Sequence, residues 1–93
     1  MIGLVVVSHS AAVAESVCQL AAPLAQGKMR LAAAGGTPDP EYPVGTDPVR
    51  VLRAIESVWS DEGVIVLMDL GSALLNAETA LDLLGDDRRA RVH

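Results

Sequence analysis

Aromatic residues are almost missing from this chain. Tyr42 and Trp59 are the only two, and phenylalanine does not occur. The core must therefore be built from Val, Leu, Ile and Ala, and little is available to stack on a flavin ring. Cysteine is as scarce, because Cys18 stands alone. That excludes an intramolecular disulfide and a CxxC motif, and we expect Cys18 to be a small buried hydrophobe on a helix.

Basic residues and long apolar runs are also lacking. Seven Lys and Arg stand against twelve Asp and Glu, for a net charge of −5. Nucleic-acid binding needs many cationic contacts to phosphates, so we exclude it. No apolar run approaches the roughly 20 residues that cross a bilayer, and no secretory signal begins the chain. We expect a cytoplasmic protein without membrane insertion and without a metal site, since zinc would need more Cys and His.

Apolar residues, by contrast, make up 51% of these 93 residues, which fits one small domain. Two continuous runs rich in β-branched residues, Ile2–Val7 and Val64–Met68, are typical of strands covered on both faces. A weaker candidate strand, Met29–Ala34, lies between them and ends at two glycines. We therefore predict three buried strands.

Helical spacing fills the intervals between these strands. The first helix follows Ser8 or Ser10 as its cap and ends near 23–27. Asp47 and Pro48 start a second helix, and its apolar stripe is predicted to be core. A third helix runs from about Ser72 to Gly85. The apolar positions are Val13, Val17, Leu20 and Leu24 in the first helix and Val51, Leu52, Ile55, Val58 and Trp59 in the second.

The alternation of strands and helices predicts a doubly wound α/β fold. We expect a mainly parallel sheet with strand order 2-1-3, then 4, and helices on both faces. Residues 35–46, rich in Gly and Pro, are predicted to be a loop or flap. Residues 86–93 lead toward the fourth strand through 89–92, and we assign His93 no role.

Polar residues or glycines follow the end of each predicted strand. His9 follows the first strand, Gly35-Gly36-Thr37 the second, and Asp69 the third. In a 2-1-3 sheet the first and third strands are neighbours, so His9 and Asp69 come within reach of each other. A carboxylate on one imidazole nitrogen raises the basicity of the other, and glycine backbones can approach an anion. Singly, Asp69 also fits a helix cap and the glycines a turn; together these features favour a phosphoryl acceptor.

These segments resemble mannose-type IIA domains of the phosphoenolpyruvate-dependent phosphotransferase system. The resemblance is strongest to the branch that serves bacterial dihydroxyacetone kinases. It covers nearly the whole chain, here taken as a single IIA-like domain over residues 1–93. Family members continue through a further strand and helix, so we expect one sheet face to be partly bare and association to be favoured. The motifs are Val5-Val6-Val7-Ser8-His9-Ser10, Ala33-Ala34-Gly35-Gly36-Thr37, Val66-Leu67-Met68-Asp69-Leu70-Gly71-Ser72-Ala73 and Asn76-Ala77-Glu78.

The resemblance implies a phosphotransferase that acts through phosphohistidine. His9 would take a phosphoryl group from phosphorylated HPr and pass it to ADP held by a kinase subunit, with Asp69 beside the histidine. Gly36, Thr37, Gly71 and Ser72 would contact the phosphoryl group. The resemblance also implies a homodimer, and no bound cofactor is expected, because no GxxxxGK[ST] motif is present.

Three alternatives remain open at this point. A IIA domain of a sugar transporter would pass its phosphoryl group to a IIB domain instead. A small-molecule binding module would use the same sheet edge, although the two aromatic residues argue against flavin. A regulatory interaction module would not need His9 to carry phosphate, so replacing His9 by Ala would leave its function intact.

Overall fold

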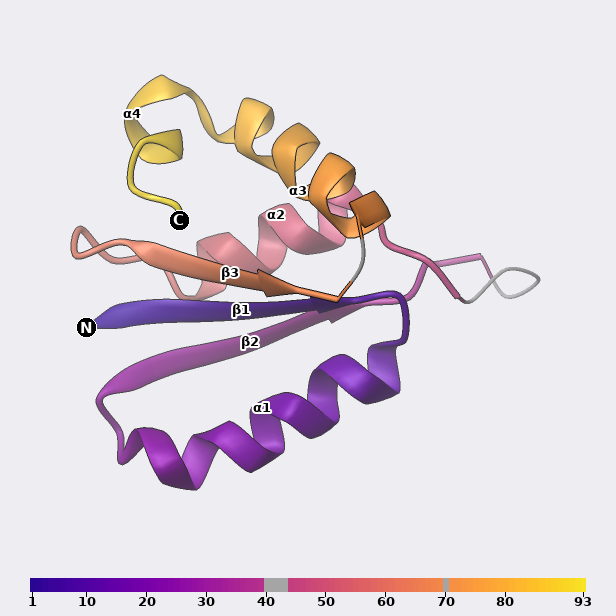
Figure 1. Cartoon of the computed structure of the whole chain (residues 1–93). Coiled ribbons are helices and arrows are strands. Elements are labelled where there is room, and N and C mark those ends of the chain that lie inside the picture. Colours follow the sequence, from indigo (N-terminus) through magenta and orange to yellow (C-terminus); the bar gives the residue numbers. More distant parts are fainter. Residues whose placement is uncertain (40–43, 70) are drawn as a thin grey trace.

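The strand that His9 follows lies at the centre of the sheet in a computed structural model of the chain (Figure 1). The structure describes residues 1–39, 44–69 and 71–93, and the side chains of residues 71–76 lie outside that description. The first three predicted strands and the three predicted helices form within about two residues of their expected bounds. In chain order they are β1 (Ile2–Ser8), α1 (Ala11–Ala25), β2 (Met29–Gly35), α2 (Pro48–Ser57), β3 (Val64–Met68), α3 (Gly71–Leu84) and α4 (Asp86–Arg89).

The three strands are parallel and take the order β2-β1-β3, which confirms the predicted order 2-1-3. β1 pairs with β2 from Ile2↔Met29 to Ser8↔Gly35. β3 pairs with the other edge of β1, from Gly3↔Val64 to Val7↔Met68. Because parallel strands end at one edge of a sheet, the segments after all three strands meet there.

The predicted fourth strand through residues 89–92 is wrong at its start, because Asp86–Arg89 forms the short helix α4. Two acidic residues followed by two arginines match the charges that a helix favours at its two ends. Only the last residues pair with β3, through a parallel bridge between Val64 and Val92. His93, to which no role was given, contributes its backbone: its N–H donates to Val64 O and its carbonyl accepts from Val66 N, each at 2.7 Å.

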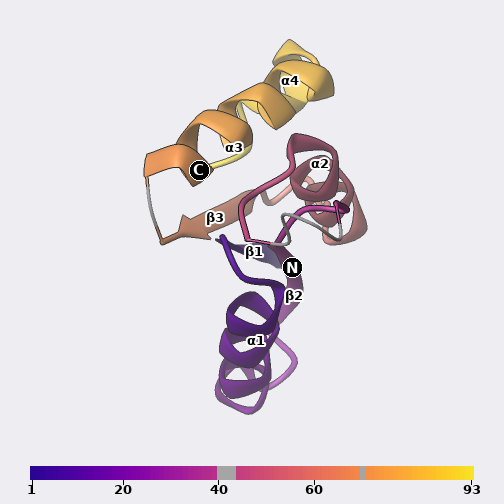
Figure 2. The same cartoon turned by 90° about the vertical axis from the view of Figure 1, so that its right-hand side faces the viewer.

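Helices cover both faces of the sheet, as predicted: α1 lies on one side, and α2 and α3 lie on the other (Figures 1 and 2). The core gathers mainly on the α2 and α3 side. Of the predicted stripe on α2, Val51, Ile55 and Val58 are buried, while Leu52 and Trp59 pack against this cluster half-buried. Within the described residues, no helix is long and apolar enough to cross a membrane.

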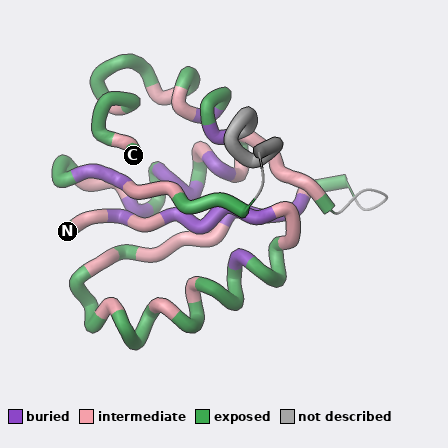
Figure 3. Tube along the Cα trace, in the orientation of Figure 1, coloured by how far each residue is buried: buried purple, intermediate pink, exposed green. Residues whose placement is uncertain are grey.

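The α1 side is much more open (Figure 3). Ala14 is the buried residue of α1, whereas the helically spaced Val13, Val17, Leu20 and Leu24 are all exposed. Leu67 and Met68 at the end of β3 are exposed as well. The predicted burial of Cys18 is therefore only partly right. Its thiol is half-buried, and this burial raises its pKa.

Candidate active site

His9 sits in the two-residue connection between β1 and α1. Its neighbours on both sides are fixed: Ser8 ends the buried strand, and Ser10 caps the helix. The Ser10 hydroxyl accepts from Val13 N at 3.3 Å, and Ser10 N donates to Ser8 Oγ at 3.2 Å. The β-branched strand before His9 and the capping serine after it thus hold the histidine backbone at the carboxyl edge of the sheet.

Asp69, directly after β3, binds His9 through both carboxylate oxygens. Oδ1 lies 3.0 Å from His9 Nδ1, and Oδ2 accepts from His9 N at 3.2 Å. Ser8 Oγ also donates to Oδ2, at 2.8 Å. Sixty residues separate His9 from Asp69 in the chain. The predicted juxtaposition of these two residues is present, because β1 and β3 are direct neighbours.

The hydrogen bonds around Asp69 stabilise its ionised form. The bond from the His9 ring, then that from the Ser8 hydroxyl, lower the pKa of Asp69 to about 2. A carboxylate at Nδ1 favours the tautomer with its proton on that nitrogen, so the lone pair lies on Nε2, the far side of the ring. The His9 side chain is 19% exposed. This arrangement holds a partly exposed imidazole in a fixed orientation.

The connection after β2 reaches the same place. Gly36, with φ +69, turns the chain, and Thr37 Oγ1 accepts from Asp39 N at 3.3 Å. Further along, Gly45 N donates to His9 O at 2.7 Å. A Cβ on Gly45 would lie 3.0 Å from Thr37 Cγ2, so the Thr37 methyl packs against Gly45. The sheet therefore brings Gly36 and Thr37 beside the His9 backbone.

The last two predicted residues belong to the start of α3. This helix begins at Gly71, two residues after Asp69, so its amino end lies beside the carboxylate. The Ser72 side chain lies outside the described residues, and so does the whole of Leu70. Backbone N–H groups in the first helical turn have no partners within the helix and are suited to an anion.

Sequence reasoning missed two residues of this site. Ser8 was considered only as a helix cap, yet it is buried and its hydroxyl holds Asp69. A polar residue closing a strand of three valines was the available signal. Gly45 carried no signal of its own in a loop rich in Gly and Pro. Its hydrogen bond to His9 joins residues that lie far apart in the sequence.

These observations define a class: a doubly wound α/β domain with a histidine and carboxylate pair at the carboxyl edge of its sheet. Among the residues that the structure describes, no group of three or more His, Cys, Asp or Glu side chains is placed to hold a metal ion. The oriented imidazole and the nearby backbone N–H groups suit transfer of a charged group through a covalent histidine adduct.

The chain belongs to the EIIA-man family, described as the PTS system fructose IIA component, which it matches over residues 3–93. It is 54% identical over 85 residues to the phosphoryl donor subunit DhaM of a phosphoenolpyruvate-dependent dihydroxyacetone kinase from Pantoea ananatis, covering 90% of this chain and 18% of that protein. The Escherichia coli DhaM is 50% identical over 93 residues, 99% of this chain and 20% of that protein. This chain thus spans about a fifth of the length of both relatives.

A shorter relative and a solved structure extend these similarities. The phosphoryl donor subunit DhaM of a phosphoenolpyruvate-dependent dihydroxyacetone kinase 2 from Listeria innocua is 33% identical over 84 residues. The match covers 90% of this chain and 66% of that protein. The crystal structure of EF1359, a protein of unknown function, superposes with a TM-score of 0.82 at 27% identity. That match covers 99% of this chain and 69% of the other, and it agrees with the α/β fold described above.

Proposed function

We propose that this protein is a phosphocarrier of a phosphoenolpyruvate-dependent dihydroxyacetone kinase and that His9 carries the phosphoryl group. The observation that carries the proposal is the 3.0 Å contact between His9 Nδ1 and Asp69 Oδ1. It favours the tautomer whose lone pair lies on Nε2 and keeps a carboxylate ready to stabilise positive charge on the ring. The DhaM relatives support the choice of pathway.

In the first step, His9 Nε2 attacks the phosphorus of a phosphohistidine on HPr. A new N–P bond forms as the bond to the HPr nitrogen breaks, and the Nδ1 proton stays on His9, held by Asp69. In the second step, a terminal oxygen of ADP in the kinase subunit attacks the same phosphorus, which releases His9 and forms ATP. Backbone N–H groups of Gly36, Thr37, Gly71 and Ser72 would stabilise charge on the equatorial oxygens.

We also propose where the protein acts and in which oligomeric state. Transfer driven by phosphoenolpyruvate places the protein in the cytoplasm together with HPr and the kinase subunit. The exposed apolar side chains of α1, above all Leu20 and Leu24, support self-association into a homodimer.

Intact mass spectrometry tests the carrier function. The protein is incubated with phosphoenolpyruvate, enzyme I and HPr, alongside His9→Ala and the matched control His93→Ala, which changes the other histidine. We expect an acid-labile gain of about 80 Da in the wild type and in His93→Ala but not in His9→Ala. A folded wild-type protein that gains no mass would contradict the proposal.

The family description favours one second candidate, a IIA domain of a sugar transporter. Such a domain would pass its phosphoryl group to a IIB domain. Phosphorylated protein mixed with ADP and the kinase subunit, or with a IIB domain, separates the two candidates. Loss of the mass gain only in the presence of the kinase subunit and ADP supports the carrier of dihydroxyacetone kinase.

A further inference from the structure

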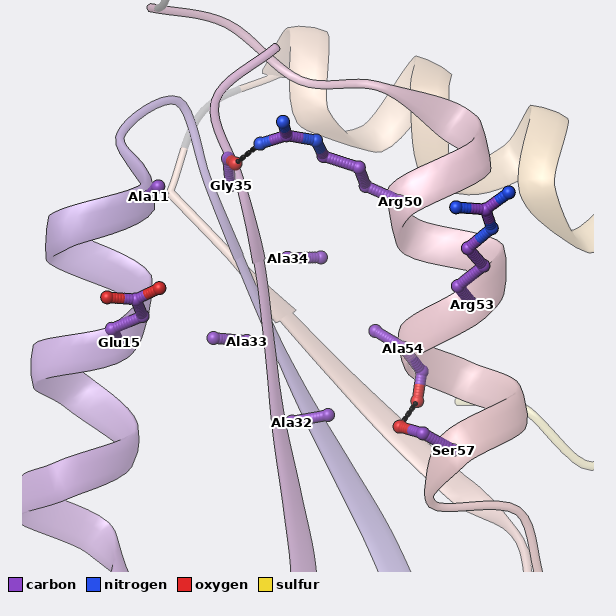
Figure 4. A pocket seen from close by; sticks show the side chains of 10 residues that line it. All are labelled: Ala11, Glu15, Ala32, Ala33, Ala34, Gly35, Arg50, Arg53, Ala54 and Ser57. Carbon is purple, nitrogen blue, oxygen red and sulfur yellow. Dashed lines mark hydrogen bonds between the residues drawn. The ribbon is translucent and has the colours of Figure 1, made fainter. Parts of the chain in front are cut away.

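An open cavity of about 320 Å³ follows the outer edge of β2, between α1 and α2 (Figure 4). Two arginines of α2 line it and behave differently. Arg50 reaches across to β2, where its Nη1 donates to Gly35 O at 2.8 Å. Arg53 points away from β2 in Figure 4, and within the described residues its side chain has no hydrogen bond or ion pair. The helix therefore sends one arginine to the end of the strand and leaves the next one in solvent.

The carbonyl that Arg50 holds belongs to a residue with no room around it. Gly35 pairs with Ser8, and a Cβ there would lie 2.7 Å from Ser10 O and 3.0 Å from Ala11 N. The main chain that follows His9 thus packs directly against Gly35. Any shift of Gly35 toward or away from α2 would move the turn at Gly36 relative to His9.

The far end of the same connection is fixed to His9 itself. Gly45 N donates to His9 O, and its φ of +144 is a conformation that favours glycine. Thr37 packs against Gly45 through its methyl group. The connection between β2 and α2 is therefore held twice, by Arg50 at its start and by the His9 carbonyl near its end.

We propose that Arg50 is a positioning residue for phosphoryl transfer. By holding the Gly35 carbonyl, it fixes the Gly36–Thr37 turn against the His9 main chain and so aligns the backbone groups that would face the phosphoryl group. This inference rests on the proposed function, whose site it deepens. A guanidinium suits the task because it is always charged and its planar donors define a direction as well as a distance.

The test compares Arg50→Met with Arg53→Met. Methionine keeps an unbranched apolar stem but has no donor, so both variants lose the same charge and only one loses a hydrogen bond. We measure the maximal rate of His9 phosphorylation by phospho-HPr, the HPr concentration at half that rate, and the amide NMR signals of Gly36 and Thr37. Arg50→Met should lower the maximal rate about tenfold at an unchanged half-saturating concentration, since small misplacements are costly to transfer.

The amide chemical shifts of Gly36 and Thr37 should change in Arg50→Met and remain unchanged in Arg53→Met. Arg50→Lys, which keeps a donor, should restore part of the rate; it also serves as the test variant if Arg50→Met does not fold. A lower melting temperature with unchanged rate and unchanged amide signals would overturn the proposal, because Arg50 would then only stabilise the fold.

The two proposals fail in distinguishable ways. If the wild-type protein takes no phosphoryl group, the carrier function is wrong, and the amide signals still decide whether Arg50 positions the turn. If the wild type is phosphorylated and Arg50→Met matches Arg53→Met in every readout, the carrier function stands and the role of Arg50 is wrong.

Discussion

The two faces of the sheet bury their helices to very different depths. On one face, Ile55 of α2 is 0% exposed; on the other, Leu20 and Leu24 of α1 are 69% and 76% exposed. Both helices carry apolar residues at helical spacing. Such spacing indicates a helix, but burial also requires a second layer opposite it. The stability of this domain therefore comes mainly from the α2 side.

The largest effect is expected from shortening a side chain on the packed face. Ile55→Ala should lower the free energy of unfolding by about 2–5 kcal/mol, because it leaves a cavity in the core. Leu20→Ala on α1 is the matched control and should change it by less than about 0.5 kcal/mol. Urea denaturation measures both. Equal losses in the free energy of unfolding for the two variants would contradict the inferred difference between the two faces.

The second largest loss of stability is expected from adding a side-chain atom at Gly3, on the packed face of the sheet. A Cβ on Gly3 would lie 2.4 Å from Val58 O and 2.7 Å from Val58 Cγ2. Gly3→Ala should therefore cost about 1–3 kcal/mol in thermal or urea unfolding. Adding Val58→Ala removes one of the two clashing groups, so the double variant should lose less than the sum of the single losses. Strict additivity would argue against this contact.

Removing a helix cap should cost about the same stability on either face of the sheet. Ser10 caps α1 and Asp47 caps α2, each through one hydrogen bond of 3.3 Å to a backbone N–H. We expect Ser10→Ala and Asp47→Ala to cost about 1 kcal/mol each, because capping is local. Circular dichroism melting curves measure both losses. A much larger loss for Asp47→Ala would mean that caps, too, depend on the layer beneath.

Polar substitutions on the exposed face should leave the fold almost unchanged. For the monomer, the double variant Leu20→Gln and Leu24→Gln should alter the free energy of unfolding by less than about 0.5 kcal/mol. It should also weaken the proposed self-association, which sedimentation measures as a fall in apparent mass. An unchanged dimer would locate the interface elsewhere.

The smallest effect on stability is expected at Asp69, at the carboxyl edge of the sheet. Because hydrogen bonds hold the pKa of Asp69 down to about 2, its ionised form stabilises the folded state above its ordinary pKa of 3.8. That contribution is lost as the pH falls from about 4 toward 2. Ser8→Ala should raise the pKa of Asp69 and narrow this window, as carboxyl carbon NMR can show. An unmoved pKa would exclude the Ser8 bond as a cause. Partial exposure of Asp69 keeps the effect on stability small.

Much of the fold could be predicted from the sequence, because each strand is one continuous run and the starts of α1 and α2 each carry a capping side chain. The strand order placed His9 and Asp69 on neighbouring strands, and their contact follows from that alone. Proline after Asp47 fixed the start of α2 within one residue. These are local signals whose physical causes lie within a few residues of one another.

The remainder depends on contacts that local patterns do not encode. Nothing near Arg50 says that its guanidinium reaches Gly35, fifteen residues earlier in the chain. The bond from Gly45 to His9 likewise depends on the path of a long connection. The short helix α4 takes in Arg89, the first residue of the predicted strand, and its acidic start and basic end suit the two ends of a helix.

The separation of 60 positions between His9 and Asp69 also sets an order of events during synthesis. The histidine leaves the ribosome early, while the carboxylate that orients it arrives only with β3. Until β3 pairs with β1, the nascent chain has a histidine but no tautomer preference imposed by a partner. The orientation of the histidine by Asp69 therefore arises only once β3 has paired with β1.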